Sequence, residues 1–184
     1  MNALVWYVAY GSNLSRDRFA CYVQGGQPAG ARRSYPGCRD RTPPREVVGL
    51  RLPGRIRFGG LSRVWGGGLA FLDAEAGDRE VVARGYLIGT DQLDEVHSWE
   101  RRYDSRSKVG DRDGLPMVAL TSSEHHAPAA PSAAYLRTIL SGLTDGLLEV
   151  DAAITYLLAA PGVDLRWDDA ELRAMAEQPT VERG

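Results

Sequence analysis

Lysine is almost absent from this sequence. Only Lys108 stands among its 22 lysines and arginines, a bias typical of a GC-rich genome rather than of one function. Acidic residues number 24, so the formal net charge is −2. A chain with this balance carries no broad basic surface, which argues against a protein that binds nucleic acid or an anionic membrane surface.

Cysteine and histidine are scarce as well. Cys21 and Cys38 are the only cysteines, and two of the three histidines are the neighbours His125 and His126. None of these residues stands at the spacing of a zinc site or of a redox pair. We therefore expect two reduced thiols and no metal site.

Long apolar runs are missing too. No stretch approaches the roughly 18 residues that span a bilayer. The N-terminus lacks the basic region, apolar stretch and cleavage site of a secretory signal, so we expect a cytoplasmic protein that does not enter a membrane. With 184 residues and 43% hydrophobic content, residues 1–184 are expected to form a single domain with a substantial core.

Apolar periodicity predicts both strands and helices. The expected strands are 3–10, 47–52, 56–58, 69–72, 81–88 and 115–120. The first expected helices are 15–24 and two turns from an N-cap at Asp91. A third is started by Pro131 and Ser132 and carries Tyr135 to Leu143, and a fourth carries Val150 to Leu158 and is stopped by Pro161-Gly162. A last short helix follows a capping box at Asp168 and Glu171. Residues 25–46 are expected to be a long loop rich in Arg, Pro and Gly, 101–114 a polar segment, and 165–184 a C-terminal tail. Because the elements do not alternate as β-α-β units, the order favours an α+β fold.

The most informative motif is the run Tyr7–Leu14, which reads Tyr-Val-Ala-Tyr-Gly-Ser-Asn-Leu. It predicts a strand that ends in a tight turn, Gly11–Asn13, directly before a helix. Such a turn points unpaired backbone N–H groups, and the positive end of the helix dipole, at one place. The turn therefore suits a carboxylate or an oxyanion, although a plain strand–helix connection would have the same pattern.

This run closely resembles the N-terminal signature of the γ-glutamyl cyclotransferase-like family. The resemblance implies the fold of that family, which we expect as a small mixed β-barrel with surrounding helices. It also implies cyclisation of a γ-glutamyl amide to 5-oxoproline with release of the free amine. In that reading Tyr10, Gly11, Ser12, Asn13 and Leu14 bind the γ-glutamyl group. The reaction requires no metal or organic cofactor, and the expected partner is a small-molecule γ-glutamyl substrate.

Glu100 is the candidate catalytic residue. It directly follows Trp99, and a carboxylate beside a large apolar ring is partly desolvated, which suits a general base. The alternative is a surface glutamate paired with Arg101 or Arg102. The resemblance favours catalysis, because the family places its glutamate after a Gly-containing strand and a short helix, often as Leu-Asp-x-x-Glu-Gly. Here Val96-His97 stands in place of Leu-Asp and Arg101 in place of Gly, so Glu95 stays a rival for the same role.

A further match lies downstream. Pro131-Ser132 followed by Tyr135 and Ile139 is similar to the Pro-Ser-x-x-Tyr-x-x-x-Ile segment of the family, whose tyrosine borders the active-site cleft. Without the resemblance, Tyr135 is equally well explained as a helical core tyrosine. The resemblance therefore adds Tyr135 to the expected substrate-binding residues.

Two functions of other classes stay open. The departures around Glu100 leave room for a module on the same scaffold that binds a carboxylate or γ-glutamyl ligand without turning it over. The loop 25–46 carries five arginines that would match anionic groups, either as a lid over the substrate or as a surface for a partner. These arginines are Arg32, Arg33, Arg39, Arg41 and Arg45.

Overall fold

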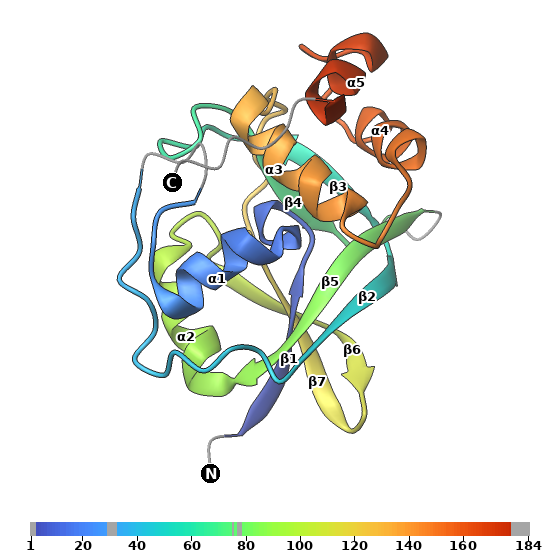
Figure 1. Cartoon of the computed structure of the whole chain (residues 1–184). Coiled ribbons are helices and arrows are strands. Elements are labelled where there is room, and N and C mark those ends of the chain that lie inside the picture. Colours follow the sequence, from blue (N-terminus) through green and yellow to red (C-terminus); the bar gives the residue numbers. More distant parts are fainter. Residues whose placement is uncertain (1–2, 29–32, 75, 77–78, 178–184) are drawn as a thin grey trace.

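The computed structural model describes residues 3–28, 33–74, 76 and 79–177, and its main sheet has five strands (Figure 1). Their order across the sheet is β2 (Glu46–Pro53), β5 (Glu80–Gly89), β1 (Leu4–Ala9), β7 (Leu115–Thr121) and β6 (Ser105–Arg112). All neighbours are antiparallel except β1 and β7, which run parallel. The first strand of the chain is thus in the middle of the sheet.

The α+β class is confirmed, but the expected barrel is wrong. Strands β3 (Arg55–Gly59) and β4 (Leu69–Asp73) form a separate two-stranded sheet, and in the described residues no pairing joins the edge strands β2 and β6. The sheet is therefore open. Strand β6 lies within the segment that we expected to hold no element. Its sequence, Ser-Arg-Ser-Lys-Val-Gly-Asp-Arg, is polar and its residues are exposed or half-buried, so its apolar pattern is too weak to predict a strand.

In the described part of the chain, five α-helices and one 3-10 helix accompany the sheets, and every expected helix is present. They are η1 (Ser12–Leu14), α1 (Arg16–Gln24), α2 (Thr90–Trp99), α3 (Ala133–Thr144), α4 (Val150–Leu158) and α5 (Asp169–Glu177). Asp168 and Glu171 form the predicted capping box of α5. The N-cap of α2 is Gly89 rather than Asp91. The side-chain oxygen of Gln92, three residues on, accepts a hydrogen bond from the Gly89 N–H at 3.0 Å, as in a capping box.

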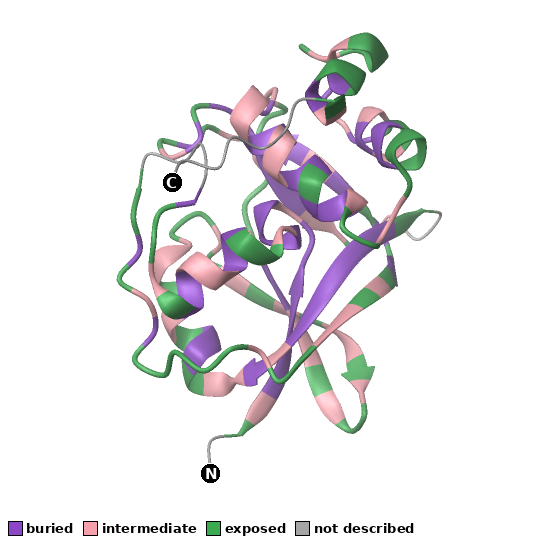
Figure 2. Ribbon diagram, viewed as in Figure 1, coloured by how far each residue is buried: buried purple, intermediate pink, exposed green. Residues whose placement is uncertain are grey.

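Two hydrophobic cores lie on opposite faces of the main sheet. Helices α1 and α2 cover one face, while α3, α4, α5 and the small sheet lie on the other (Figure 1). Strand β1 contributes alternate residues to both, with Tyr7 in the first core and Val8 in the second. The central strands β1 and β5 are buried along most of their length, whereas β6 is not (Figure 2). The turn after β1 therefore starts from a buried strand in the middle of the sheet.

Candidate functional site

The turn between β1 and α1 leaves three backbone N–H groups outside its own hydrogen bonds. Strand β1 continues through one residue into η1, whose first hydrogen bond runs from the Leu14 N–H to the Gly11 carbonyl oxygen, 2.9 Å. The N–H groups of Gly11, Ser12 and Asn13 precede that bond, so the turn does not use them itself. A bound oxyanion or carboxylate would find its donors there.

Two tyrosines enclose the outer side of this turn. A Cβ atom added to Gly11 would lie 3.0 Å from the phenolic oxygen of Tyr135, so close approach is what requires glycine here. The same oxygen accepts from the N–H of Ala70 at 3.2 Å, and the Tyr103 hydroxyl donates to the Ala70 carbonyl at 2.7 Å. Burial raises the pKa of Tyr135 to about 12, so its hydroxyl stays neutral at physiological pH.

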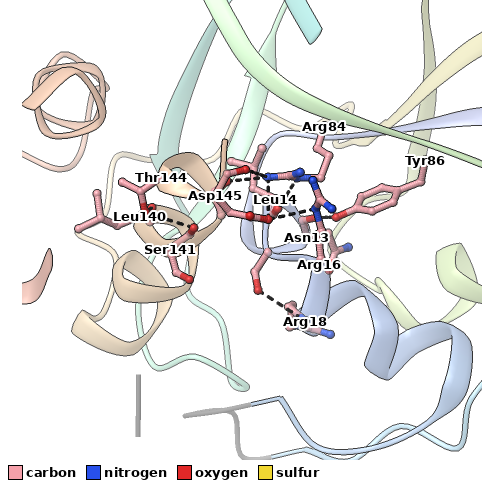
Figure 3. A network of polar contacts seen from close by, with 12 residues as sticks. Asn13, Leu14, Arg16, Arg18, Arg84, Tyr86, Leu140, Ser141, Thr144 and Asp145 are labelled. Atoms are coloured by element: carbon pink, nitrogen blue, oxygen red, sulfur yellow. Dashed lines mark hydrogen bonds and ion pairs between the residues drawn. The ribbon is translucent and has the colours of Figure 1, made fainter. Parts of the chain in front are cut away.

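Arg84 on β5 fixes the turn from the inner side (Figure 3). Its Nε donates to the Leu14 carbonyl at 2.8 Å, and its Nη2 donates to the carbonyls of Gly142 at 3.0 Å and Asp145 at 2.7 Å. Arg84 is only 1% exposed, so its guanidinium makes these hydrogen bonds from inside the core. Arg84 therefore ties the turn to the C-terminal end of α3.

Asn13 is held by both its backbone and its side chain. Its carbonyl accepts from the Tyr86 hydroxyl at 2.7 Å, and its Nδ2 donates to the Tyr7 hydroxyl at 2.9 Å. The side-chain oxygen Oδ1 is buried and has no hydrogen-bond partner among the described residues. An acceptor left unpaired in this way is ready for a donor that the free protein lacks.

Glu100 ends α2 in a tight turn that points its carboxylate at α1. Its N–H donates to the His97 carbonyl at 3.1 Å, and its own carbonyl accepts from the Tyr103 N–H at 2.8 Å. The carboxylate oxygen Oε1 accepts from the Tyr22 hydroxyl at 2.5 Å. Glu100 and the residues of the β1–α1 turn line one small cavity of about 20 Å³, room for about one water molecule.

A larger cavity of about 510 Å³ adjoins the small one, since Ser12, Glu100 and Tyr103 line both. Its volume is in the range of small-molecule sites. Six aromatic side chains line it: Tyr22, Tyr35, Trp65, Trp99, Tyr103 and Tyr135. Five arginines also line it: Arg18, Arg33, Arg63, Arg101 and Arg102. Glu100 is the one acidic residue among the described lining residues, so the cavity favours an anionic ligand.

Arg18 is the buried cation of this wall, at 3% exposure. Its Nη2 donates to the hydroxyls of Tyr22 at 2.9 Å and Tyr35 at 3.3 Å, and its guanidinium lies over the Tyr22 ring at 4.2 Å. Burial lowers the pKa of Arg18, but attraction to Tyr22 and Glu100 outweighs that effect and the net pKa is raised. Arg18 therefore keeps its charge inside the protein.

Part of the loop 25–46 forms a wall of the larger cavity. Arg33 and Tyr35 line it, whereas Arg39 lies on Glu95, with its Nε 3.2 Å from the carboxylate. The buried side chain of Gln92 holds the loop, because its Nε2 donates to the carbonyls of Asp40 and Thr42, both at 2.9 Å. Of the other predicted loop arginines, Arg32 lies outside the described residues.

The structure brings most of the predicted site residues together. Five of them line the small cavity: Tyr10, Gly11, Ser12, Asn13 and Glu100. Tyr135 lines the larger one. Leu14 lines neither cavity: its side chain is fully buried in the core, and it meets the site through the carbonyl that Arg84 binds. Glu95, the rival of Glu100, is likewise in neither lining.

The sequence analysis missed the α1 side of the site. Arg18 and Tyr22 stand four residues apart and so lie on one face of the helix. Apolar spacing alone predicts Leu14, Phe19 and Val23 as the inward-facing residues here, and all three are buried. The available signal was an arginine and a tyrosine at that spacing next to buried positions, a pattern that apolar periodicity ignores.

None of the described helices is long and apolar enough to cross a membrane. No group of three His, Cys, Asp or Glu side chains that could hold a metal ion occurs among the residues that the structure describes.

Comparison with known proteins places the fold. No protein-family model matches the chain. Histone deacetylase 5 of Arabidopsis thaliana is 39% identical over 130 residues, which are 67% of this chain and 20% of that protein. The chain spans about a fifth of the length of this curated relative. The name of that whole protein therefore does not indicate the activity of this chain.

Two solved structures cover nearly the whole chain. An uncharacterized human protein superposes with a TM-score of 0.61 at 19% identity, over 95% of this chain and 99% of that one. A γ-glutamyl cyclotransferase superposes with a TM-score of 0.59 at 19% identity, over 95% of this chain and 98% of that one. The chain therefore has the same fold as these two proteins, which confirms the fold that the resemblance of the run Tyr7–Leu14 implied.

Proposed function

We propose that this protein cyclises a small-molecule γ-glutamyl amide to 5-oxoproline and releases the free amine, with Glu100 as the single acid and base. One observation carries the proposal: the Glu100 carboxylate and the donor turn Gly11–Asn13 line the same small cavity. A base and an oxyanion site within one cavity are the two parts that this reaction needs.

The chemistry requires one proton to be moved between two nitrogens. The substrate's neutral α-amine attacks its own γ-carbonyl carbon, and Glu100 takes the proton that this nitrogen loses. The carbonyl oxygen becomes an oxyanion, which the N–H groups of Gly11, Ser12 and Asn13 stabilise. The bond to the leaving nitrogen then breaks as Glu100 returns the proton to it, and the carboxylate is ionised again.

The shape of the site supports an intramolecular reaction. Attack on a carbonyl within the same molecule depends on holding the chain folded, so that the amine meets the carbonyl carbon. Tyr135 and Tyr103 confine the turn from outside, and Arg84 fixes it from inside. The unpaired Oδ1 of Asn13 gives the substrate amine an acceptor beside Glu100.

The larger cavity then receives the leaving part of the substrate. The small cavity is far too small for a γ-glutamyl amide, whereas the adjoining cavity of about 510 Å³ has room for one. Its arginines favour a substrate with an anionic group. Arg33 and Tyr35 place the loop 25–46 beside that substrate, which supports its role as a covering segment.

A mass-spectrometric assay of 5-oxoproline release tests the proposal. The panel contains γ-glutamyl amino acids, peptides and amines, and the variants are Glu100→Gln and Glu95→Gln. We expect wild type and Glu95→Gln to release 5-oxoproline, and Glu100→Gln to lose about 10²-fold or more. Glu95→Gln is the matched control, because its carboxylate lies on Arg39 and lines neither cavity.

Calorimetry with the same panel separates the enzyme from a binding module. Binding of γ-glutamyl compounds by wild type and Glu100→Gln alike, with no 5-oxoproline from any of them, would replace the proposed enzyme with a non-catalytic ligand-binding protein.

A further inference from the structure

A chain of three side chains connects α1 to the carboxylate of Glu100. Arg18 Nη2 lies 2.9 Å from the Tyr22 hydroxyl oxygen, and that oxygen lies 2.5 Å from Glu100 Oε1. The neighbouring carboxylate of α2, Glu95, is not part of this chain and pairs with Arg39 instead. Glu100 lies at the end of α2, but its carboxylate is held by a side chain of α1.

The chemistry of the three groups fixes the direction of both hydrogen bonds. A guanidinium has donors only, so the Tyr22 oxygen must accept from Arg18. The tyrosine then has a single proton left, and an ionised carboxylate can only accept it. Burial, and next to it the charge of Glu100, raises the pKa of Tyr22 well above its usual value, so the tyrosine keeps the proton that it donates.

The Tyr22 ring is confined on all sides. The Arg18 guanidinium lies 4.2 Å from its centre, the Trp99 ring stacks on it at 5.7 Å, and the Tyr35 ring meets it edge-on at 4.4 Å. The Tyr35 hydroxyl lies 3.3 Å from Arg18 Nη2, so the loop that carries Tyr35 joins the same arrangement. The Tyr22 hydroxyl has two acceptors in reach, Glu100 Oε1 at 2.5 Å and the Tyr35 hydroxyl at 3.5 Å, and the shorter contact with the carboxylate is the stronger one.

We infer that Tyr22, oriented by Arg18, is a positioning residue for Glu100: it holds Oε1 and leaves Oε2 to exchange the proton with the substrate. The inference rests on the proposed function of Glu100. Within the described part of the chain, no donor contacts Oε2. Without Tyr22 the carboxylate would rotate between orientations, and fewer of them would place an oxygen in line with the amine.

Steady-state kinetics of Tyr22→Phe test the inference. The change removes the hydroxyl and keeps the ring, so we expect kcat for 5-oxoproline release to fall about 10- to 100-fold while KM changes less than about twofold. Tyr156→Phe is the matched control. Its hydroxyl is hydrogen-bonded too, accepting from the Val82 N–H at 3.3 Å, but Tyr156 lines neither cavity, and the kcat of the variant should equal that of wild type.

A double variant separates positioning from damage to the fold. If Tyr22 acts through Glu100, adding Tyr22→Phe to Glu100→Gln should lower the residual rate no further, because the two changes remove one interaction. Arg18→Lys, which keeps a cation beside Tyr22, should retain more kcat than Arg18→Met. Losses that multiply in the double variant would overturn the inference.

An NMR measurement on the wild type does not depend on how the variants fold. A tyrosine hydroxyl proton shared with a carboxylate exchanges slowly and resonates downfield, and it should move upfield in Glu100→Gln, where the acceptor is neutral. Absence of that proton overturns the inference, as does an unchanged kcat in Tyr22→Phe alongside an active wild type. No 5-oxoproline from wild type overturns the proposed function first, and the inference falls with it.

Discussion

The guanidinium of Arg84 and the carboxylate of Asp145 lie 3.2 Å apart, between the middle of β5 and the residue that follows α3. Arg84 is almost completely buried, while the side chain of Asp145 is 51% exposed. The arginine thus brings a charge into the core and meets its counter-ion at the surface. In between, it satisfies three carbonyl oxygens, one of which belongs to the turn of the site.

Arg84→Met should cost about 3–5 kcal/mol in the free energy of unfolding, because the two buried carbonyls of Leu14 and Gly142 lose their donor and Asp145 loses its partner. Arg55→Met is the matched control. Arg55 pairs with Asp73 at 3.1 Å with its side chain 44% exposed, so its loss should cost about 1 kcal/mol or less. Urea unfolding of both variants measures the difference. Equal losses of unfolding free energy in the two variants would mean that Arg84 does not stabilise the turn.

Gly142→Ala should destabilise the protein by about 1–3 kcal/mol and slow 5-oxoproline release. The added Cβ atom would lie 2.4 Å from the backbone of both Leu14 and Ser15, so α3 or the turn must move. Ser141→Ala is the control on the same helix, where an exposed residue is replaced. Thermal melting and the release assay read the two consequences. A fully active and stable Gly142→Ala would contradict this contact.

Gln92→Glu should release the loop 25–46 from α2. The change replaces the two-donor amide by an acceptor that faces the carbonyls of Asp40 and Thr42. Hydrogen–deuterium exchange should become faster in the described part of the loop, and KM should rise, because Tyr35 and Arg33 leave the cavity wall. Ser98→Ala changes an exposed residue of the same helix and should leave exchange in the loop unchanged.

Cys38 should be nearly inert to thiol reagents at neutral pH. Burial, together with the charges of Glu95 and Asp40, raises the pKa of its thiol to about 11. The thiolate is the reactive form, so alkylation of a Cys21→Ser variant should be very slow at about pH 7 and gain about tenfold per pH unit toward pH 10. Mass spectrometry of the alkylated protein follows this rise. A rate that levels off below about pH 9 would contradict the raised pKa.

Salt should weaken the binding of an anionic substrate. Four of the five arginines that line the larger cavity are exposed, and exposed charges are screened at high ionic strength. KM for a γ-glutamyl amino acid should rise several-fold between about 0.05 M and 0.5 M salt, while KM for a γ-glutamyl amine stays constant. Arg63→Gln should reduce this salt dependence. Arg51→Gln, outside the cavity lining, should not.

The elements were predictable where one face of each is apolar. Strand β1 and helices α1, α3 and α4 show this pattern clearly, and their apolar residues are buried where the pattern indicated. Strand β6 was not predictable, because an edge strand that faces water needs no apolar face. The open sheet was equally beyond prediction, since closure depends on which edges meet and no local pattern encodes that.

The residues of the site, like the elements of the fold, were predictable only where a local pattern indicates them. Residues adjacent in sequence, such as Gly11 and Asn13, could be placed together from the motif alone. Glu100 was reached through the order of strand, short helix and glutamate. The roles of Arg18 and Tyr22 could not be read, because they depend on how closely α1 approaches the end of α2. The four-residue spacing places both residues on one helix face, but the distance between α1 and the end of α2 is set by packing across the core, which no local sequence pattern encodes.

The central place of β1 has a consequence for the order of folding. This strand pairs with β5 on one side and with β7 on the other. During synthesis β1 emerges before both neighbours, and the second of them, β7, is complete only at Thr121. Contacts this distant along the chain close slowly. The donor turn, which directly follows β1, must therefore wait for residues that are synthesised later before it acquires its final geometry.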